Sequence, residues 1–197
     1  MKKLVARISN IVTSFRIFGA LLAAFCYWQG LSILTLGILL SLIGSNLLVN
    51  WWARSFSDES LLENRFNFIA DKVLIISMII MLALDNQLYI NYVLLVLARN
   101  ISQISFFLVL VGIMKMPLKA GANIFSNMAS YLIYLLFILI IAKQAFFSVL
   151  TENNAIMVLD KSIYAILLTS ILFEFYMLAD HFKQLGRVIR RETDIFH

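Results

Sequence analysis

Residues 44–72 read GSNLLVNWWARSFSDESLLENRFNFIADK. This stretch joins the end of one hydrophobic segment to the start of the next. One helical face before the connection carries four positions at the spacing i, i+3, i+4, i+7. They are Asn46, Val49, Asn50 and Ala53. Asn67 and Asp71 lie one turn apart on the following helix, so we expect the two faces to oppose one another.

The composition is that of an integral membrane protein. The chain has 197 residues, of which 62% are hydrophobic and 14% charged, with a mean hydropathy of +0.91. Soluble domains average about 45–50% apolar and about 25% charged residues. One proline and seven glycines leave no room for a linker, so residues 1–197 are predicted to form a single integral membrane domain. The single cysteine, Cys26, excludes an internal disulfide and is interpreted as a packing residue.

Six hydrophobic segments reach the length of about 20 residues that a membrane-spanning helix requires. They cover 8–29, 31–53, 64–85, 88–114, 124–149 and 158–185. The breaks between them include Gln29-Gly30 and Asp85-Asn86-Gln87. The predicted fold class is therefore all-α, a polytopic membrane protein with six transmembrane helices.

The basic residues predict the orientation. Most Lys and Arg cluster on one side: Lys2, Lys3, Arg7, Arg54, Arg65, Lys72, Lys115, Lys119, Lys183, Arg187, Arg190 and Arg191. The other side holds Lys143 and Lys161. By the positive-inside rule both termini are cytoplasmic, and the tail at about 182–197 is a basic amphipathic end resting on anionic headgroups. Orientation explains the net charge of +5 without a nucleic-acid partner.

The order of residues in 46–71 resembles the signature of the CDP-alcohol phosphatidyltransferases, Asp-x2-Asp-Gly-x2-Ala-Arg-x8-Gly-x3-Asp-x3-Asp. Ala53 and Arg54 fall on the Ala-Arg pair and Asp71 on the last aspartate. Asn46, Val49 and Asn67 stand at the other three aspartates, and Asn50 and Glu63 at the glycines. NIVTSFRI at 10–17 and IADKVLIIS at 69–77 are similar to the family's first-helix opening and its entry into helix three.

The resemblance implies a six-helix bundle of the kind found in phosphatidylglycerophosphate synthase and its relatives. Such enzymes transfer a phosphatidyl group from CDP-diacylglycerol to an alcohol and release CMP. By resemblance, the aspartates hold Mg²⁺ or Mn²⁺, and the last one, here Asp71, activates the attacking hydroxyl. Arg99 matches an arginine that faces a phosphate pocket, and Lys119 is the one basic residue where glycerol-phosphate-using members have several.

The substitutions remove most of the metal-binding chemistry. Asn46 and Asn67 offer a carbonyl oxygen but no charge, Val49 offers no donor, and Asp71 is the one carboxylate of four that remains. We therefore expect no metal cofactor, with Mg²⁺ or Mn²⁺ required only if the chain is active. The predicted vestigial nucleotide or lipid site consists of Asn46, Asn50, Ala53, Arg54, Asn67, Asp71, Arg99 and Lys119.

Three charged residues lie inside apolar segments, where an unpaired charge costs about 2.5–3.5 kcal/mol on insertion scales. Arg16, Arg99 and Glu174 are therefore expected to face the bundle interior, with Glu174 paired to an arginine. Both a functional role and a structural ion pair are compatible with this pattern.

Three functional hypotheses remain from the sequence. The first is a catalytically inactive transferase-like protein that binds lipid or a protein partner as a subunit of a membrane complex. The second is an active CDP-alcohol phosphatidyltransferase in phospholipid synthesis with an atypical site. The third is a small transport or maturation subunit with chance similarity. The expected partners are membrane lipids and either an integral membrane protein or a second copy. Residue usage favours a bacterial plasma membrane.

Overall fold

The computed structural model describes residues 2–56, 61–108, 124–146 and 153–189, and every regular element within these ranges is an α-helix. The helices are α1 (Lys2–Trp28), α2 (Ser32–Phe56), α3 (Leu61–Leu84), α4 (Ile90–Leu108), α5 (Ile124–Phe146) and α6 (Asn153–Ile189). The predicted all-α fold is confirmed. The last helix begins at Asn153 rather than at residue 158, and it continues into the predicted basic end as far as Ile189.

Three helices of the described residues are long and apolar enough to cross a membrane. The spans are Ile11–Trp28 in α1, Met128–Phe146 in α5 and Ala155–Asp180 in α6. A fourth apolar stretch, Ser32–Leu48 in α2, is shorter. These lengths support a membrane-embedded protein, and the six spans read from the sequence stay a prediction.

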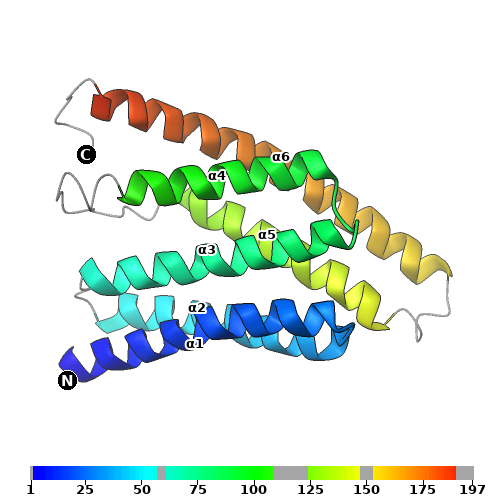
Figure 1. Cartoon of the computed structure of the whole chain (residues 1–197), viewed down its shortest axis with the longest axis horizontal. Helices are drawn as coiled ribbons and strands as arrows, with labels where there is room; N and C mark the ends of the chain where they lie inside the picture. The colour runs from blue at the N-terminus through cyan, green and yellow to red at the C-terminus, as the bar shows by residue number, and fades with distance from the viewer. Residues whose placement is uncertain (1, 57–60, 109–123, 147–152, 190–197) are drawn as a thin grey trace.

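The helices form a bundle in which the start of α1 and the end of α6 lie at the same end (Figure 1). Helix α1 packs against α2 and α3, and α4 packs against α3 and α6. Helix α5 contacts α2, α3 and α6, so it links the two groups. Segments far apart in sequence, such as α2 and α5, therefore meet inside the bundle.

The core is apolar and contributed mainly by α3 and α5. Its largest completely buried apolar side chains are Leu39, Ile75, Met78, Ile79, Leu82, Ile133, Leu136, Phe137, Ile141 and Met177. Large apolar side chains also point outward, including Phe15, Phe18 and Leu172. Because lipid tails solvate such groups as well as a protein core does, this outward face suits a membrane rather than water.

The two turns at the far end of the bundle are closed by residues in the left-handed conformation. Gly30 has a φ of 74° after α1, and Asn86 has a φ of 54° after α3. At the first turn Gly30 N donates to Tyr27 O and Leu31 N donates to Cys26 O, which is the pattern of a Schellman helix end. The predicted breaks at Gln29-Gly30 and Asp85-Asn86-Gln87 are confirmed.

Candidate functional site

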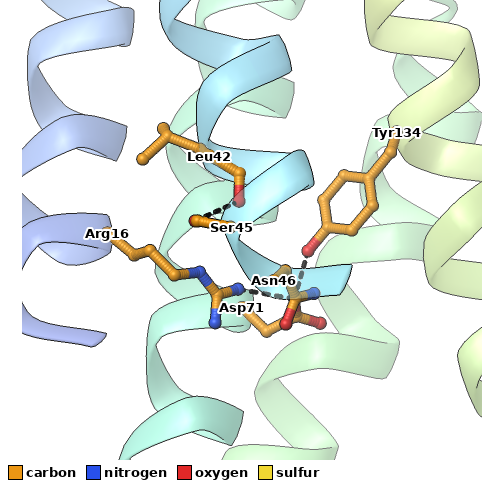
Figure 2. A network of polar contacts seen from close by, with 6 residues as sticks. All are labelled: Arg16, Leu42, Ser45, Asn46, Asp71 and Tyr134. Carbon is orange, nitrogen blue, oxygen red and sulfur yellow. Dashed lines mark hydrogen bonds and ion pairs between the residues drawn. The ribbon is translucent and has the colours of Figure 1, made fainter. Parts of the chain in front are cut away.

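Asp71 is the centre of a polar cluster that joins four helices (Figure 2). Its Oδ1 lies 3.3 Å from Arg16 Nη2 of α1 and accepts a hydrogen bond from Asn46 Nδ2 of α2 at 3.1 Å. The hydroxyl of Tyr134 on α5 donates to the same oxygen. We call Arg16, Asn46, Asp71 and Tyr134 the Asp71 cluster. The predicted meeting of Asn46 with Asp71 is confirmed as a contact.

Two members of this cluster were not predicted as partners of Asp71. Arg16 was expected to face the interior. It lies 55 positions from Asp71 in the chain, so no local sequence pattern indicates that the two residues pair. Tyr134 lies in an otherwise apolar helix, and the signal that could have found it is that a buried tyrosine hydroxyl needs a hydrogen-bond partner. Ser45, beside Asn46, donates instead to Leu42 O at 2.7 Å (Figure 2).

The charges of the Asp71 cluster balance. The side chain of Arg16 is 3% exposed and that of Asp71 is 20% exposed, so the ion pair is largely removed from solvent. A buried pair of this kind is kept in place because removal of either partner leaves an uncompensated charge. The three donors therefore fix the carboxylate between α1, α2 and α5.

A second buried ion pair lies between α4 and α6. Arg99 Nε is 2.9 Å from Glu174 Oε2, and both side chains are completely buried. The predicted pairing of Glu174 with an arginine is confirmed. The contact is close, but its angle falls outside hydrogen-bond geometry, and Nη1 and Nη2 of Arg99 have no hydrogen-bond partner among the described residues.

Lys72, which the sequence analysis counts among the basic residues of the cytoplasmic side, is buried within the bundle. It is 3% exposed, and its Nζ lies 5.2 Å from the centre of the Phe68 ring. The reason is the helical period, because Lys72 shares the buried face of α3 with Ile75 and Ile79. Lys72 interacts electrostatically with Arg99, Glu174 and Asp71, so it links the two clusters.

The set of Lys72, Arg99 and Glu174, which we call the Lys72 cluster, contains two basic side chains and one carboxylate. Tyr92 of α4 interacts electrostatically with Arg99 and Glu174. Tyr92 Oη lies 2.8 Å from Ser170 Oγ, and Asn100 Nδ2 donates to Val96 O at 2.7 Å. Because phosphate matches the planar donors of a guanidinium, the unfilled donors of Arg99 are suited to an anionic oxygen group.

The side chains of the remaining predicted site residues lie outside the described part of the chain. Asn50, Ala53 and Arg54 belong to α2 and Asn67 belongs to α3, but their side chains are outside the described part of the chain. Lys119 lies outside the described residues altogether. Of the eight predicted site residues, the structure brings Asn46 and Asp71 into contact and places Arg99 in the adjoining Lys72 cluster.

The described side chains include no group of three or more His, Cys, Asp or Glu that could hold a metal ion. The described neighbours of Asp71 Oδ1 are instead hydrogen-bond donors and a cation. A divalent ion would have to displace these donors, because hard cations take oxygen ligands and repel Arg16.

No protein-family model, curated protein or solved structure matches the chain.

Proposed function

We propose that this protein is a multi-pass membrane protein with a CDP-alcohol phosphatidyltransferase-like bundle that binds an anionic phospholipid headgroup and does not catalyse transfer. It acts as a lipid-binding or partner-binding subunit of a membrane complex in the plasma membrane, with both termini cytoplasmic. The headgroup phosphate is held by the Lys72 cluster, and the Asp71 cluster stabilises the bundle beside it.

The observation that carries the proposal is the triple engagement of Asp71 Oδ1. In a metal-dependent transferase, cations bound by carboxylates balance the charge of the diphosphate. Here the positive charge beside Asp71 comes from Arg16. Asn46 donates a hydrogen bond to the Asp71 carboxylate, whereas an aspartate at this position would be an anionic metal ligand. This arrangement supports a structural role for Asp71.

The Lys72 cluster supports anion binding. Its surplus positive charge lies inside the bundle, where an isolated charge is expensive, and the buried donors Nη1 and Nη2 of Arg99 gain from an added acceptor. A phosphate group entering between α3, α4 and α6 supplies both the negative charge and the acceptor oxygens.

Retention of lipid through purification tests this proposal. The full chain is purified from membranes containing phosphatidylglycerol and phosphatidylcholine, and the co-purified lipid is measured by native mass spectrometry. We expect phosphatidylglycerol to be retained by the unmodified chain and at least tenfold less by Lys72→Met, which removes the surplus charge but keeps the Arg99–Glu174 pair.

Lys161→Met is the matched control, because Lys161 is an exposed lysine on α6. It should retain phosphatidylglycerol as the unmodified chain does. Equal retention by Lys72→Met and Lys161→Met, or no preference for phosphatidylglycerol over phosphatidylcholine, would contradict headgroup binding at the Lys72 cluster.

An active CDP-alcohol phosphatidyltransferase is the alternative function. The feature that favours it is the retained carboxylate of Asp71, with Lys72 within electrostatic range of both Asp71 and Arg99. It requires that ligands outside the described residues, such as Asp58 or Glu59, complete a metal site. Release of CMP separates the two functions.

A further inference from the structure

We propose that a cavity beyond the end of α3 is a binding site for an organic ammonium group. The cavity, of about 450 Å³, lies where the turn between α1 and α2 meets the ends of α3 and α5. Its lining includes Tyr27, Trp28, Met81, Asp85 and Gln144. None of these residues belongs to the Asp71 cluster or the Lys72 cluster, so the inference stands apart from the proposed function.

Asp85 is held in a triangle of hydrogen bonds. Tyr27 Oη donates to Asp85 Oδ2 at 2.6 Å, and Gln144 Nε2 donates to the same oxygen at 3.0 Å and to Tyr27 Oη at 2.9 Å. The three side chains come from α1, the end of α3 and α5. No described residue donates to Asp85 Oδ1. The carboxylate is therefore fixed in position and keeps one oxygen for a ligand.

The charge of the cavity is negative. Of the described residues that line it, Asp85 alone is charged. The nearby basic residue Lys143 is engaged by Asp160 of α6 at 2.5 Å, and neither of these residues lines the cavity. The fixed carboxylate therefore favours a cation.

The aromatic side chain of Trp28 in the cavity lining favours one class of cation. Trp28 lines the cavity and is 75% exposed, so its ring is accessible, and the indole is the ring that attracts an ammonium group most strongly. A hard ion such as Ca²⁺ takes six to eight oxygen ligands, and the cavity offers one carboxylate. One anionic oxygen beside aromatic and apolar carbon suits an alkylated ammonium group.

Trp28 is the last residue of the span Ile11–Trp28, where tryptophan sits at the membrane–water interface. An ammonium group can reach this level from two sources. One is a phospholipid with an amine headgroup, and the other is a small organic cation in the aqueous phase. Both present the same chemistry to Asp85 and Trp28.

Titration with tetramethylammonium chloride tests the site. The full chain, in micelles of an uncharged detergent, is titrated by isothermal calorimetry at constant ionic strength, with sodium chloride as the blank. We expect saturable binding that Asp85→Asn weakens at least tenfold and the double variant Lys143→Met, Asp160→Asn changes less than twofold. The double variant is the matched control because it removes a carboxylate that does not line the cavity together with the lysine that this carboxylate neutralises.

A second variant separates binding from folding. Trp28→Leu leaves the hydrogen-bond triangle intact and should weaken binding about fivefold without lowering the unfolding midpoint. Binding by Asp85→Asn and Trp28→Leu equal to that of the unmodified chain, or heats no different from the sodium chloride blank, would overturn the site.

Lipid nanodiscs distinguish the two sources. Phosphatidylethanolamine added to phosphatidylglycerol discs should compete with tetramethylammonium and raise its apparent Kd if the headgroup occupies the cavity. An unchanged Kd assigns the site to a soluble ammonium compound. The tenfold effect of Asp85→Asn is expected in both cases.

Discussion

Asn46 Nδ2 of α2 donates to Asp71 Oδ1 of α3 across 3.1 Å, so an amide stands where two carboxylates would repel one another. The same oxygen lies 3.3 Å from Arg16 Nη2. An amide and a guanidinium compensate the charge of Asp71 within the bundle. The charge of Asp71 is therefore compensated without a ligand. The contribution of the cluster to the free energy of unfolding can be measured on the protein alone.

Replacement of Asp71 by Asn should destabilise the fold, because it leaves the buried guanidinium of Arg16 without its counter-charge. Breaking a fully buried pair costs about 3–5 kcal/mol, and the partial exposure of Asp71 places this change at about 3 kcal/mol. Unfolding in mixed micelles measures the loss. Ser45→Ala is the control, with a change within about 0.5 kcal/mol, because Ser45 bonds to Leu42 O of its own helix. Equal stability of the two variants would show that Arg16 does not depend on Asp71.

Carboxylates introduced at the positions of Asn46, Val49 and Asn67 should create metal binding if the proposed resemblance to the transferases holds. Asn46→Asp alone places two carboxylates side by side, and their repulsion is on the order of 1–4 kcal/mol of stability in the absence of a cation. The triple variant Asn46→Asp, Val49→Asp and Asn67→Asp should bind Mn²⁺, which raises its unfolding midpoint and not that of the unmodified chain. A triple variant whose unfolding midpoint does not change with Mn²⁺ would contradict the proposed relation of these positions to a metal site.

The Arg99–Glu174 pair should show strong coupling in a double-mutant cycle. Glu174→Gln alone leaves Lys72 and Arg99 without their buried counter-charge and should cost about 3–5 kcal/mol, whereas Arg99→Met alone leaves Glu174 with Lys72 and should cost less. The double variant Arg99→Met, Glu174→Gln leaves Lys72 as the one charge of the cluster and should be more stable than Glu174→Gln alone. Additive losses would mean that the two side chains do not interact in the membrane.

Much of the fold was predictable, because hydrophobic segments and their breaks are local signals. The turns at Gly30 and Asn86 lie where the sequence places them, since glycine and asparagine adopt a positive φ at low cost. The start of α6 was placed too late, because Asn153 and Asn154 read as loop residues although they begin the helix. Helix ends depend on capping contacts that periodicity does not report.

The candidate site was predictable only in part. The contact of Asn46 with Asp71 follows from helical spacing on consecutive helices, whereas Tyr134 comes from α5 and no local pattern links it to Asp71. Lys72 was counted only among the basic residues of the cytoplasmic side, and its burial beside Ile75 and Ile79 on α3 was not predicted. The hydrogen-bond triangle at Asp85 depends on which helices pack together, which sequence spacing alone does not determine.

The predicted orientation can be measured with single cysteines in a Cys26→Ser background. Gln87→Cys lies in the exposed turn after α3, and Lys183→Cys lies on an exposed position near the end of α6. We expect a membrane-impermeant maleimide to label position 87 in intact cells and position 183 only after permeabilisation. Three predicted crossings, in α4, α5 and α6, separate the two positions. Labelling of both positions from the same side would contradict this odd number of crossings and the predicted cytoplasmic termini.

Release of CMP from CDP-diacylglycerol by the purified full chain distinguishes an inactive protein from an active transferase. It is measured with Mg²⁺ or Mn²⁺ and with glycerol phosphate, serine or inositol as acceptor. We expect release no faster than that of protein-free micelles, and no difference between the unmodified chain and Asp71→Asn. CMP release above that background, lost in a folded Asp71→Asn variant, would instead make Asp71 a catalytic residue.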